Sequence, residues 1–291
     1  MLFEFDLAGA EWVIVAYLAN DAKMIEVAES GKSPHVATGA LMSGAPEELI
    51  ELESQLLGST TDAETLARVR REQLPQLFEL ASWIPRSMTI RQAGKKCNHG
   101  MNYDMRYKRF ALLNEIPENE ASTMVDKYHA AYPGIRGTFH EEVRQELRAN
   151  RCISDLFGNK ARLLDEPGPD LWDKAYSFKP QGTVANIVKR AMVGCFEDKR
   201  PLFEPMRMLA NVHDSLLFEY PSKPWDRALE WIAAVKAHMS PTLQCKGHSF
   251  VLGVDCKAGW NWGEMKKISA EAKVEKPTQK ADYLPTVADL W

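Results

Sequence analysis

The sequence predicts an α+β fold, built as one large domain or two closely associated domains. Short apolar runs typical of strands and longer runs with helical period follow one another without strict βαβ alternation, which favours α+β over a doubly wound sheet. The 291 residues are 45% hydrophobic and 26% charged, so the chain can form a sizeable core. We find no internal repeat.

The N-terminal half is predicted to be mainly helical after one strand. Residues 2–18 are expected to form a short strand, a turn at Gly9 and an apolar helix from about Ala10. Helical period then continues through three further segments, of which the last is cationic: 35–42, 46–82 and 87–113.

Further helices are predicted in the C-terminal half. A long amphipathic helix pair over 118–149 breaks at Tyr132-Pro133-Gly134, because proline and glycine interrupt helices. Another helix is expected over 181–197, opened by Gln181-Gly182-Thr183, and one more over 225–239.

Strands are predicted in three places between and after these helices. Residues 151–164 indicate a hairpin that turns at Gly158-Asn159, and 207–220 indicate two strands joined by a tight turn at His213-Asp214. A last strand is expected over 249–255. The tail, 268–291, is rich in Lys, Glu, Ala and Pro and is expected to be flexible.

Composition excludes several classes of protein. The net charge of −4 gives no global basic field, so nucleic-acid binding would have to rest on local cationic patches. The five cysteines lack C-x-x-C spacing, which favours reduced thiols over zinc or a disulfide framework. No apolar run reaches membrane-spanning length, and the N-terminus carries Glu4 and Asp6 instead of a basic signal region, so we expect a soluble, cytoplasmic protein.

Two carboxylates about 200 residues apart each lie at the edge of an apolar run. Asp6 ends the first predicted strand, and Asp214 lies in a turn between two strands. Mg²⁺ prefers oxygen ligands, and carboxylates at a sheet edge supply them. A backbone carbonyl, such as that of Leu7, can add one more. The alternatives are a helix-capping Asp6 and an ordinary turn residue at Asp214.

A cationic helix pattern lies between these carboxylates. Helical spacing places Arg91, Lys95 and Asn98 on neighbouring turns of one face, with His99 and Tyr103 continuing nearby. Arginine matches phosphate oxygens with its planar fork, and lysine acts as a point charge, so this face suits a triphosphate. The alternative is an exposed basic face without a ligand.

Together these segments resemble the motifs of family A DNA polymerases, in the family's order. Residues 5–11 resemble D-Y-S-x-I-E, 91–103 resemble R-x-x-x-K-x-x-x-[FY]-G-x-x-Y, and 211–215 resemble V-H-D-E. Residues 181–192 resemble Q-G-T-A-A-D-I-I-K-x-A-M, and the likeness covers roughly 3–265. Three residues depart from the family pattern: His99 stands for Phe or Tyr, Asp104 for Gly and Ser215 for Glu.

The resemblance implies a polymerase palm, an antiparallel sheet with helices, and a helical fingers subdomain. By this likeness the palm comprises 1–30, with the metal-site strand and helix, and 151–267. The fingers comprise 31–150, and 268–291 form the flexible tail.

The resemblance also implies a two-metal nucleotidyl transfer. Asp6, Asp214 and the Leu7 carbonyl would hold two Mg²⁺ ions, which activate the primer 3′-hydroxyl and steady the leaving pyrophosphate. Lys95 is the expected proton donor to the pyrophosphate. Three side chains would hold the triphosphate: His35, Arg91 and Lys95. His35 taken alone is as well explained by a structural role.

Selection of the sugar and contacts to DNA are assigned by the same likeness. Glu11 and Tyr103 would reject ribonucleotides, and His99 would lie over the incoming sugar. Gln181 would read the minor groove of the primer-template, while His213 would lie near the primer end. The implied substrates are dNTPs and primer-template DNA.

The chain has little length before Asp6 for a thumb or a 3′–5′ exonuclease. We therefore expect a split polymerase of DNA replication, completed by a second chain that supplies thumb, exonuclease or both. Such genes fit a bacteriophage, which would place the protein in the cytoplasm of a bacterial host. The segment from Val287 to Trp291 resembles sliding-clamp-binding peptides; the alternative is a hydrophobic terminus that docks on a partner of its own or on nothing. The rival functions are a catalytically weak nucleic-acid-binding or assembly subunit and an RNA polymerase or reverse transcriptase of the same palm type.

Overall fold

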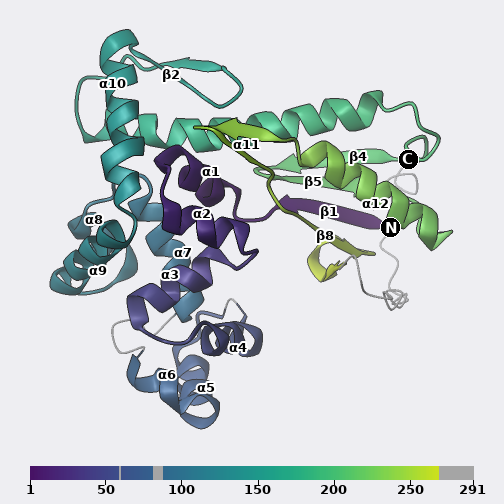
Figure 1. Ribbon diagram of the computed structural model, residues 1–291. Helices are drawn as coiled ribbons and strands as arrows, with labels where there is room; N and C mark the ends of the chain where they lie inside the picture. The colour runs from purple at the N-terminus through teal and green to yellow at the C-terminus, as the bar shows by residue number, and fades with distance from the viewer. Residues whose placement is uncertain (59, 81–87, 269–291) are drawn as a thin grey trace, which may run out of the picture. The chain divides into compact units, whose positions relative to one another are not determined.

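A computed structural model describes residues 1–58, 60–80 and 88–268, and within them the chain forms two compact units. The first comprises Met1–Ala8, Ala185–Pro241 and residues 251–268. The second comprises Gly9–Val184 and Thr242–Phe250. Helices and antiparallel strands make up both, so the predicted α+β class is confirmed (Figure 1).

The first unit is built on a five-stranded antiparallel sheet of order β4-β5-β1-β8-β9. The predicted first strand and the two strands around His213-Asp214 are confirmed in it. Strand β1 lies at the centre and is paired on both edges. The strand bounds are β1 Leu2–Leu7, β4 Arg207–Val212, β5 Ser215–Glu219, β8 Val254–Gly259 and β9 Lys266–Lys267.

Alternation along β1 decides which face of the sheet is covered. Phe3, Phe5 and Leu7 are buried, whereas Glu4 and Asp6 between them stay partly exposed. Helix α12 (Trp225–Met239), predicted over 225–239, covers the buried face. Its Trp231 is fully buried and packs against the rings of Phe3, Phe5, Phe218 and Tyr220. The opposite face of the sheet therefore carries the polar side chains of β1.

The strand expected over 249–255 was placed wrongly. Strand β8 begins at Val254, and His248–Phe250 (β7) instead pairs with Leu243–Cys245 (β6) in a hairpin of the second unit. The hairpin turns at Lys246 and Gly247, which both have positive φ, 48° and 83°. The predicted strand joined the end of β7 to the start of β8, which residues 251–253 separate.

The second unit is mainly helical, as predicted (Figure 1). Its central helix α7 packs against α3, α4 and α9. The helices are α1 Ala10–Ala19, α2 Ala22–Glu29, α3 Pro34–Ser43, α4 Glu47–Leu57, α5 Ala63–Gln73, α6 Pro75–Leu80, α7 Ile90–Met101, α8 Tyr107–Asn114, α9 Glu118–Ala131 and α10 Glu141–Asn150.

Helices α3 and α7 meet through two glycines. A Cβ atom added to Gly94 would lie 2.2 Å from the His35 carbonyl oxygen and 2.7 Å from the Gly39 nitrogen. A Cβ on Gly39 would in turn lie 3.0 Å from the Ile90 carbonyl oxygen. The two backbones approach so closely because neither glycine has a side chain there.

The break predicted at Tyr132-Pro133-Gly134 separates α9 from α10. Between them Ile135–His140 form a π-helical turn, a local widening that is rare in helices. The predicted hairpin follows, with strands β2 (Cys152–Ser154) and β3 (Lys160–Arg162).

The helix expected to open at Gln181 begins much earlier. Helix α11 runs from Pro169 to Glu197 and contains Pro180, which costs it one backbone hydrogen bond. It continues through the proline because buried residues at helical spacing occur on both sides: Leu171, Ala175, Val184, Ile187, Val188, Ala191 and Cys195. Thr183 is thus not a cap, and its hydroxyl donates to the Lys179 carbonyl, 2.7 Å away, inside the helix.

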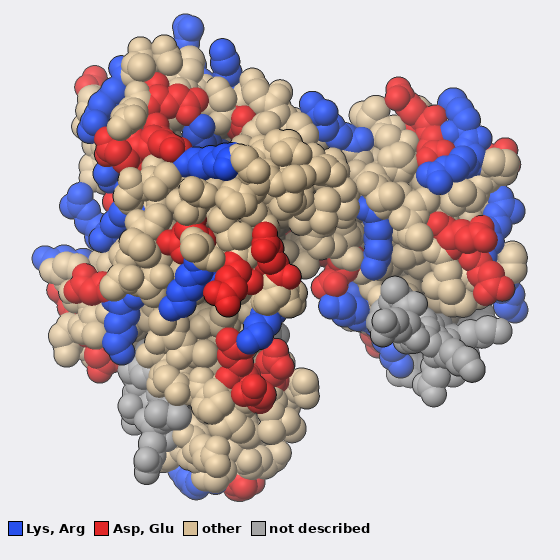
Figure 2. Space-filling model, in the orientation of Figure 1, with Lys and Arg blue, Asp and Glu red and all other residues tan. Residues whose placement is uncertain are grey.

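The surface shown in Figure 2 carries Lys and Arg interspersed with Asp and Glu, in keeping with the small net charge. All five cysteines are free thiols, as expected. No helix within the described residues is long and apolar enough to cross a membrane. The predicted flexible tail, apart from residue 268, and the segment from Val287 to Trp291 lie outside those residues.

Candidate functional site

The structure brings the two predicted carboxylates together on the sheet of the first unit. Asp6 faces Ser215 across β1 and β5, and the Leu7 amide donates to the Asp214 carbonyl at 3.3 Å. Both carboxylates are partly exposed. The Leu7 side chain is buried in the core, which leaves its backbone carbonyl as the one group it can offer to a ligand.

The surroundings of Asp6 disfavour the negative charge of its carboxylate. Burial, and then the negative charge of Asp214, raise its pKa from 3.8 to about 6. Lys257 acts in the opposite direction but is held by Glu4, at 3.4 Å. In the described part of the chain, no side chain forms a hydrogen bond or ion pair with the Asp6 or Asp214 carboxylate. Two like charges without a partner are suited to a cation.

The turn that presents Asp214 is braced by its neighbours. His213 is exposed and has positive φ, 53°, a conformation that histidine adopts more readily than most residues. The Ser215 hydroxyl donates to the Val212 carbonyl at 3.0 Å, and the Asn211 side-chain amide donates to the Ser215 carbonyl at 3.0 Å. Ser215, where the family pattern has Glu, therefore stabilises the turn and supplies no third carboxylate.

Helix α7 in the second unit carries the predicted cationic face. Arg91 is partly exposed and Lys95 and His99 are exposed at four-residue spacing, so they share one side of the helix. The His99 ring meets the Tyr103 ring edge-on, with centroids 5.8 Å apart. Asn98 lies on α7 at the predicted spacing, but it is only 1% exposed and so is not open to a ligand.

Asn98 instead fixes the predicted triphosphate ligand His35. Its side-chain oxygen accepts from the Thr38 hydroxyl at 2.7 Å, and its NH₂ group donates to the Pro34 carbonyl at 3.1 Å. These partners fix the orientation of the amide, so the same NH₂ group faces His35 Nδ1, 3.1 Å away, as a donor. His35 Nδ1 is then an acceptor, and the proton of the neutral ring lies on Nε2.

Burial first, and then the charges of Arg91, Lys95 and His99, lower the pKa of His35 from 6.5 to about 4. Because the folded-state pKa is the lower one, the contribution of His35 to stability is present above pH 6.5 and is lost as the pH falls towards 4. We expect ring-nitrogen NMR shifts to report His35 as neutral at pH 5. Adding a triphosphate should raise its pKa, and a His35 that titrates near pH 6.5 in the free chain would contradict this environment.

The predicted sugar-selecting residues also meet. The Tyr103 hydroxyl donates a short hydrogen bond to the Glu11 carboxylate, and the Gln181 amide donates to the same oxygen at 3.4 Å. Burial and the Glu11 charge raise the pKa of Tyr103 far above its usual value, so the hydroxyl stays protonated as a donor. Glu11 lies in the first turn of α1, where the helix dipole favours a carboxylate.

One residue of the site, Asp255, has no signal in the sequence, and neither has the burial of Asn98. Asp255 lies opposite Asp6 on β8 and pairs with Lys267 at 2.8 Å. Asn98 belongs to the cationic pattern, but its burial depends on Thr38, which is distant in sequence. Within the described ranges, no three His, Cys, Asp or Glu side chains form a group that could hold a metal ion by themselves.

Comparison with known proteins agrees with these observations. A profile of DNA polymerase family A matches residues 77–264, more than half of the chain. DNA polymerase I of Deinococcus radiodurans is 29% identical over 276 residues, which are 91% of this chain and 24% of that protein. The thermostable DNA polymerase I of Thermus aquaticus is 26% identical over 236 residues, 77% of this chain and 23% of that protein.

A solved structure shows the same fold. The POL domain of Pol1 from M. smegmatis, in complex with DNA primer-template and dNTP, aligns with a TM-score of 0.63 at 21% identity, covering 88% of this chain and 38% of that one. The chain spans about a quarter of the length of the curated relatives it matches. The matched profile contains the cationic helix and the Asp214 turn, and on this basis the chain belongs to DNA polymerase family A.

Proposed function

We propose that this chain is a DNA-directed DNA polymerase subunit that transfers nucleotides from dNTPs to a primer 3′-hydroxyl and releases pyrophosphate. The observation that carries the proposal is the Asp6–Asp214 pair. Asp6 lies on β1 and Asp214 lies in the turn before the neighbouring strand β5, the charge of Asp214 helps to raise the pKa of Asp6, and no described side chain forms a hydrogen bond or ion pair with either carboxylate. In the same proposal residues 1–30 and 151–267 form the palm, and residues 31–150, which contain α3 to α10, form the fingers.

The residues at the pair fit a hard divalent cation. Asp6, Asp214 and the Leu7 carbonyl offer oxygen atoms only, and their small number suits Mg²⁺, which keeps several waters and is commonly shared with substrate phosphates. When bound, two Mg²⁺ ions would lower the pKa of the 3′-hydroxyl and stabilise the leaving pyrophosphate. Removal of divalent cations should therefore abolish the reaction.

Helix α7 is proposed to hold the triphosphate. Arg91 presents a fork of N–H donors, Lys95 a mobile charge, and neutral His35 an Nε2–H donor. These groups would compensate the charge that develops on the phosphates. Lys95 is the proposed proton donor to the pyrophosphate, which a loss of rate at saturating dNTP in Lys95→Ala would support.

The Glu11–Tyr103 contact is proposed to exclude ribonucleotides, with His99 beside the incoming sugar. Glu11→Ala should lower the preference for dNTP over NTP by about 100-fold, because a carboxylate that blocks the 2′-hydroxyl is removed. Relative kcat/KM values for the two nucleotides measure it. Glu11→Gln keeps the length of the side chain and should retain most of the preference. Equal preference in Glu11→Ala and wild type would contradict the assignment.

Two further residues are proposed to contact the primer-template. Gln181 is exposed on α11, and its amide suits the acceptors of the minor groove. His213 is exposed beside Asp214, where the primer end would lie.

We also propose that a partner chain supplies thumb and exonuclease functions. The response of primer extension to added candidate partner chains tests this proposal. A phage source and clamp binding through residues 287–291 are further proposals. Loss of clamp binding when those residues are deleted would support the last of them.

The test is Mg²⁺-dependent primer extension by the purified chain at low salt, which favours weak DNA binding. Extension establishes the activity. If extension appears only when a candidate partner is added, the split arrangement is supported. Absence of extension with every partner, together with retained DNA binding, would favour the nucleic-acid-binding subunit. Comparable rates with NTPs or RNA templates would favour the other polymerase types.

A further inference from the structure

A buried ion pair lies at the N-terminus of α7. Arg70 on α5 and Glu53 on α4 are joined by a contact of 2.7 Å, and their side chains are 7% and 0% exposed. Among the ion pairs of the described residues, no other has both side chains below a tenth exposed. Burial of two charges is expensive unless every donor and acceptor is well placed.

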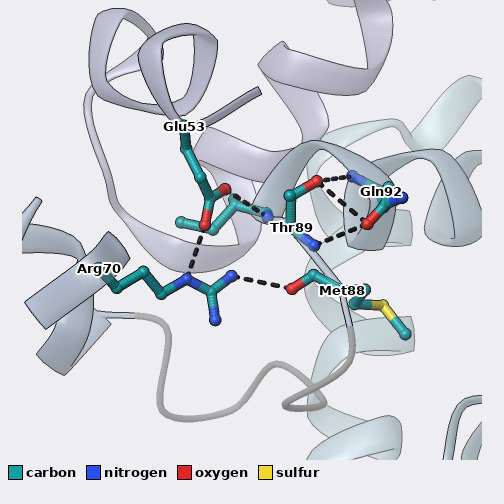
Figure 3. Close-up of polar contacts among 6 residues, drawn as sticks. Glu53, Arg70, Met88, Thr89 and Gln92 are labelled. Atoms are coloured by element: carbon teal, nitrogen blue, oxygen red, sulfur yellow. Dashed lines mark hydrogen bonds and ion pairs between the residues drawn. The ribbon is translucent and has the colours of Figure 1, made fainter. Parts of the chain in front are cut away.

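Both members of this pair also bind the backbone around the start of α7 (Figure 3). The Glu53 carboxylate accepts from Arg70 Nε with one oxygen and from the Ile90 amide, at 2.7 Å, with the other. Arg70 Nη2 donates to the Met88 carbonyl at 2.8 Å. Thr89, between these contacts, caps the helix through a capping box with Gln92. The first turn of α7 is therefore fixed to α4 and α5.

The surroundings of the pair are apolar. On α4, Ile50 and Leu57 flank Glu53 at helical spacing, and each belongs to a buried hydrophobic cluster. An apolar pair of similar volume could fill the same space, but it could not accept from the Ile90 amide or donate to the Met88 carbonyl. Both backbone groups belong to buried residues, so leaving them without partners would lower stability. The ion pair therefore satisfies these two groups and, through them, sets the rotation and axial position of α7.

We infer that Glu53 and Arg70 are positioning residues for triphosphate binding, a role that rests on the proposed function. Arg91 directly follows Ile90, whose amide Glu53 holds, and Lys95 lies about one turn further along. The fork of Arg91 binds a phosphate well only at a defined orientation. Arg70 in addition neutralises Glu53, which would otherwise place an unpaired negative charge beside a site for an anion.

The experiment compares wild type with Arg70→Lys, with the apolar double variant Glu53→Leu/Arg70→Met, and with Glu51→Gln. Glu51 is exposed on the same helix, so its substitution controls for charge. Three quantities are measured in the full chain: hydrogen exchange of the first amides of α7, KM for dNTP with kcat, and the Kd for primer-template. Thermal unfolding is recorded for each protein.

The double variant should stay folded but unfold at a lower temperature than wild type, because the Ile90 amide and the Met88 carbonyl lose their partners, and it should exchange the first amides of α7 faster. Its KM for dNTP should rise by about 10- to 100-fold, because small displacements of a binding group have effects of this size, while the Kd for primer-template stays unchanged. Arg70→Lys keeps the charge but cannot reproduce the two-point contact, so an intermediate effect is expected. Glu51→Gln should match wild type.

A folded double variant with the wild-type KM would overturn the inference, as would unchanged exchange in α7. Equal losses of dNTP and DNA affinity would indicate general damage and would also overturn it. If wild type neither extends a primer nor binds dNTP, the proposed function fails and the positioning role with it. Hydrogen exchange distinguishes that failure, because it reports the contact with α7 without any substrate.

Discussion

Primer extension by Asp214→Asn is expected to be at least about 10³-fold slower than extension by wild type, since loss of a metal ligand removes several kcal/mol of transition-state stabilisation. Folding should not suffer. Asp6 carries a pKa raised by burial and then by Asp214, so removing the second charge relieves a repulsion. Without divalent cations at pH 8, we expect the variant to unfold at or above the wild-type temperature. Extension rates and thermal unfolding measure the two effects.

Asp255→Asn is the matched control for this substitution. Asp255 lies opposite Asp6 on the same sheet, but it is already paired with Lys267. The same change of charge there should reduce extension by less than about tenfold, as for other removals of a partly exposed ion pair. Equal losses of extension rate at both positions would show that the rate depends on the acidic charge of this sheet in general and not on Asp214 in particular. A normal rate in Asp214→Asn would remove the main support for the proposed site.

Gly94→Ala is expected to destabilise the second unit by about 3 kcal/mol, at the upper end of the cost of overpacking. Alanine ordinarily stabilises a helix relative to glycine. Here the added Cβ would meet the backbone of His35 and Gly39, at 2.2 and 2.7 Å, and backbone cannot rotate away. The helices α3 and α7 would separate, and with them His35 and Arg91. Urea unfolding followed by circular dichroism, with dNTP affinity below the transition, checks both consequences.

Gly137→Ala provides the comparison. Gly137 is exposed, has ordinary φ, and a Cβ there would contact nothing within 4 Å. The substitution should leave stability unchanged or raise it by up to about 1 kcal/mol. If the two alanine variants behaved alike, close packing of α3 on α7 would not be what holds His35 near the cationic face.

The sequence predicted correctly those parts of the fold that depend on residues close together in the chain. Alternation in residues 2–7 and the positive φ at Gly9 determine the strand and turn beside Asp6. Two apolar runs around His213-Asp214 predicted the hairpin that presents the second carboxylate. These features depend on neighbours in sequence, whereas the pairing of β1 with β5 joins distant segments and was implied only by the family resemblance.

The remaining features depend on contacts between distant segments. A helix was expected to begin at Gln181, but α11 already runs through Pro180, because Ala175 and Val184 are buried on both sides of it. Asn98 follows the helical spacing of the cationic face. Its burial against Thr38 could not be predicted from that spacing, because it is set by the crossing of α3 on α7. Glu53 gave no signal at all, since a glutamate in a charged helix is ordinarily exposed.

The bonding of Asn98 has a consequence for the pH range of the proposed phosphate binding. This side chain has no access to a substrate, yet its NH₂ group decides which nitrogen of His35 carries the proton. A carboxylate at the same position, different by one group, would accept instead of donate and would favour a charged ring. In the proposed function, a substitution at position 98 would change the lowest pH at which phosphate binds. It would do so without removing any group that contacts the phosphate, so the pH range and the affinity can be changed separately.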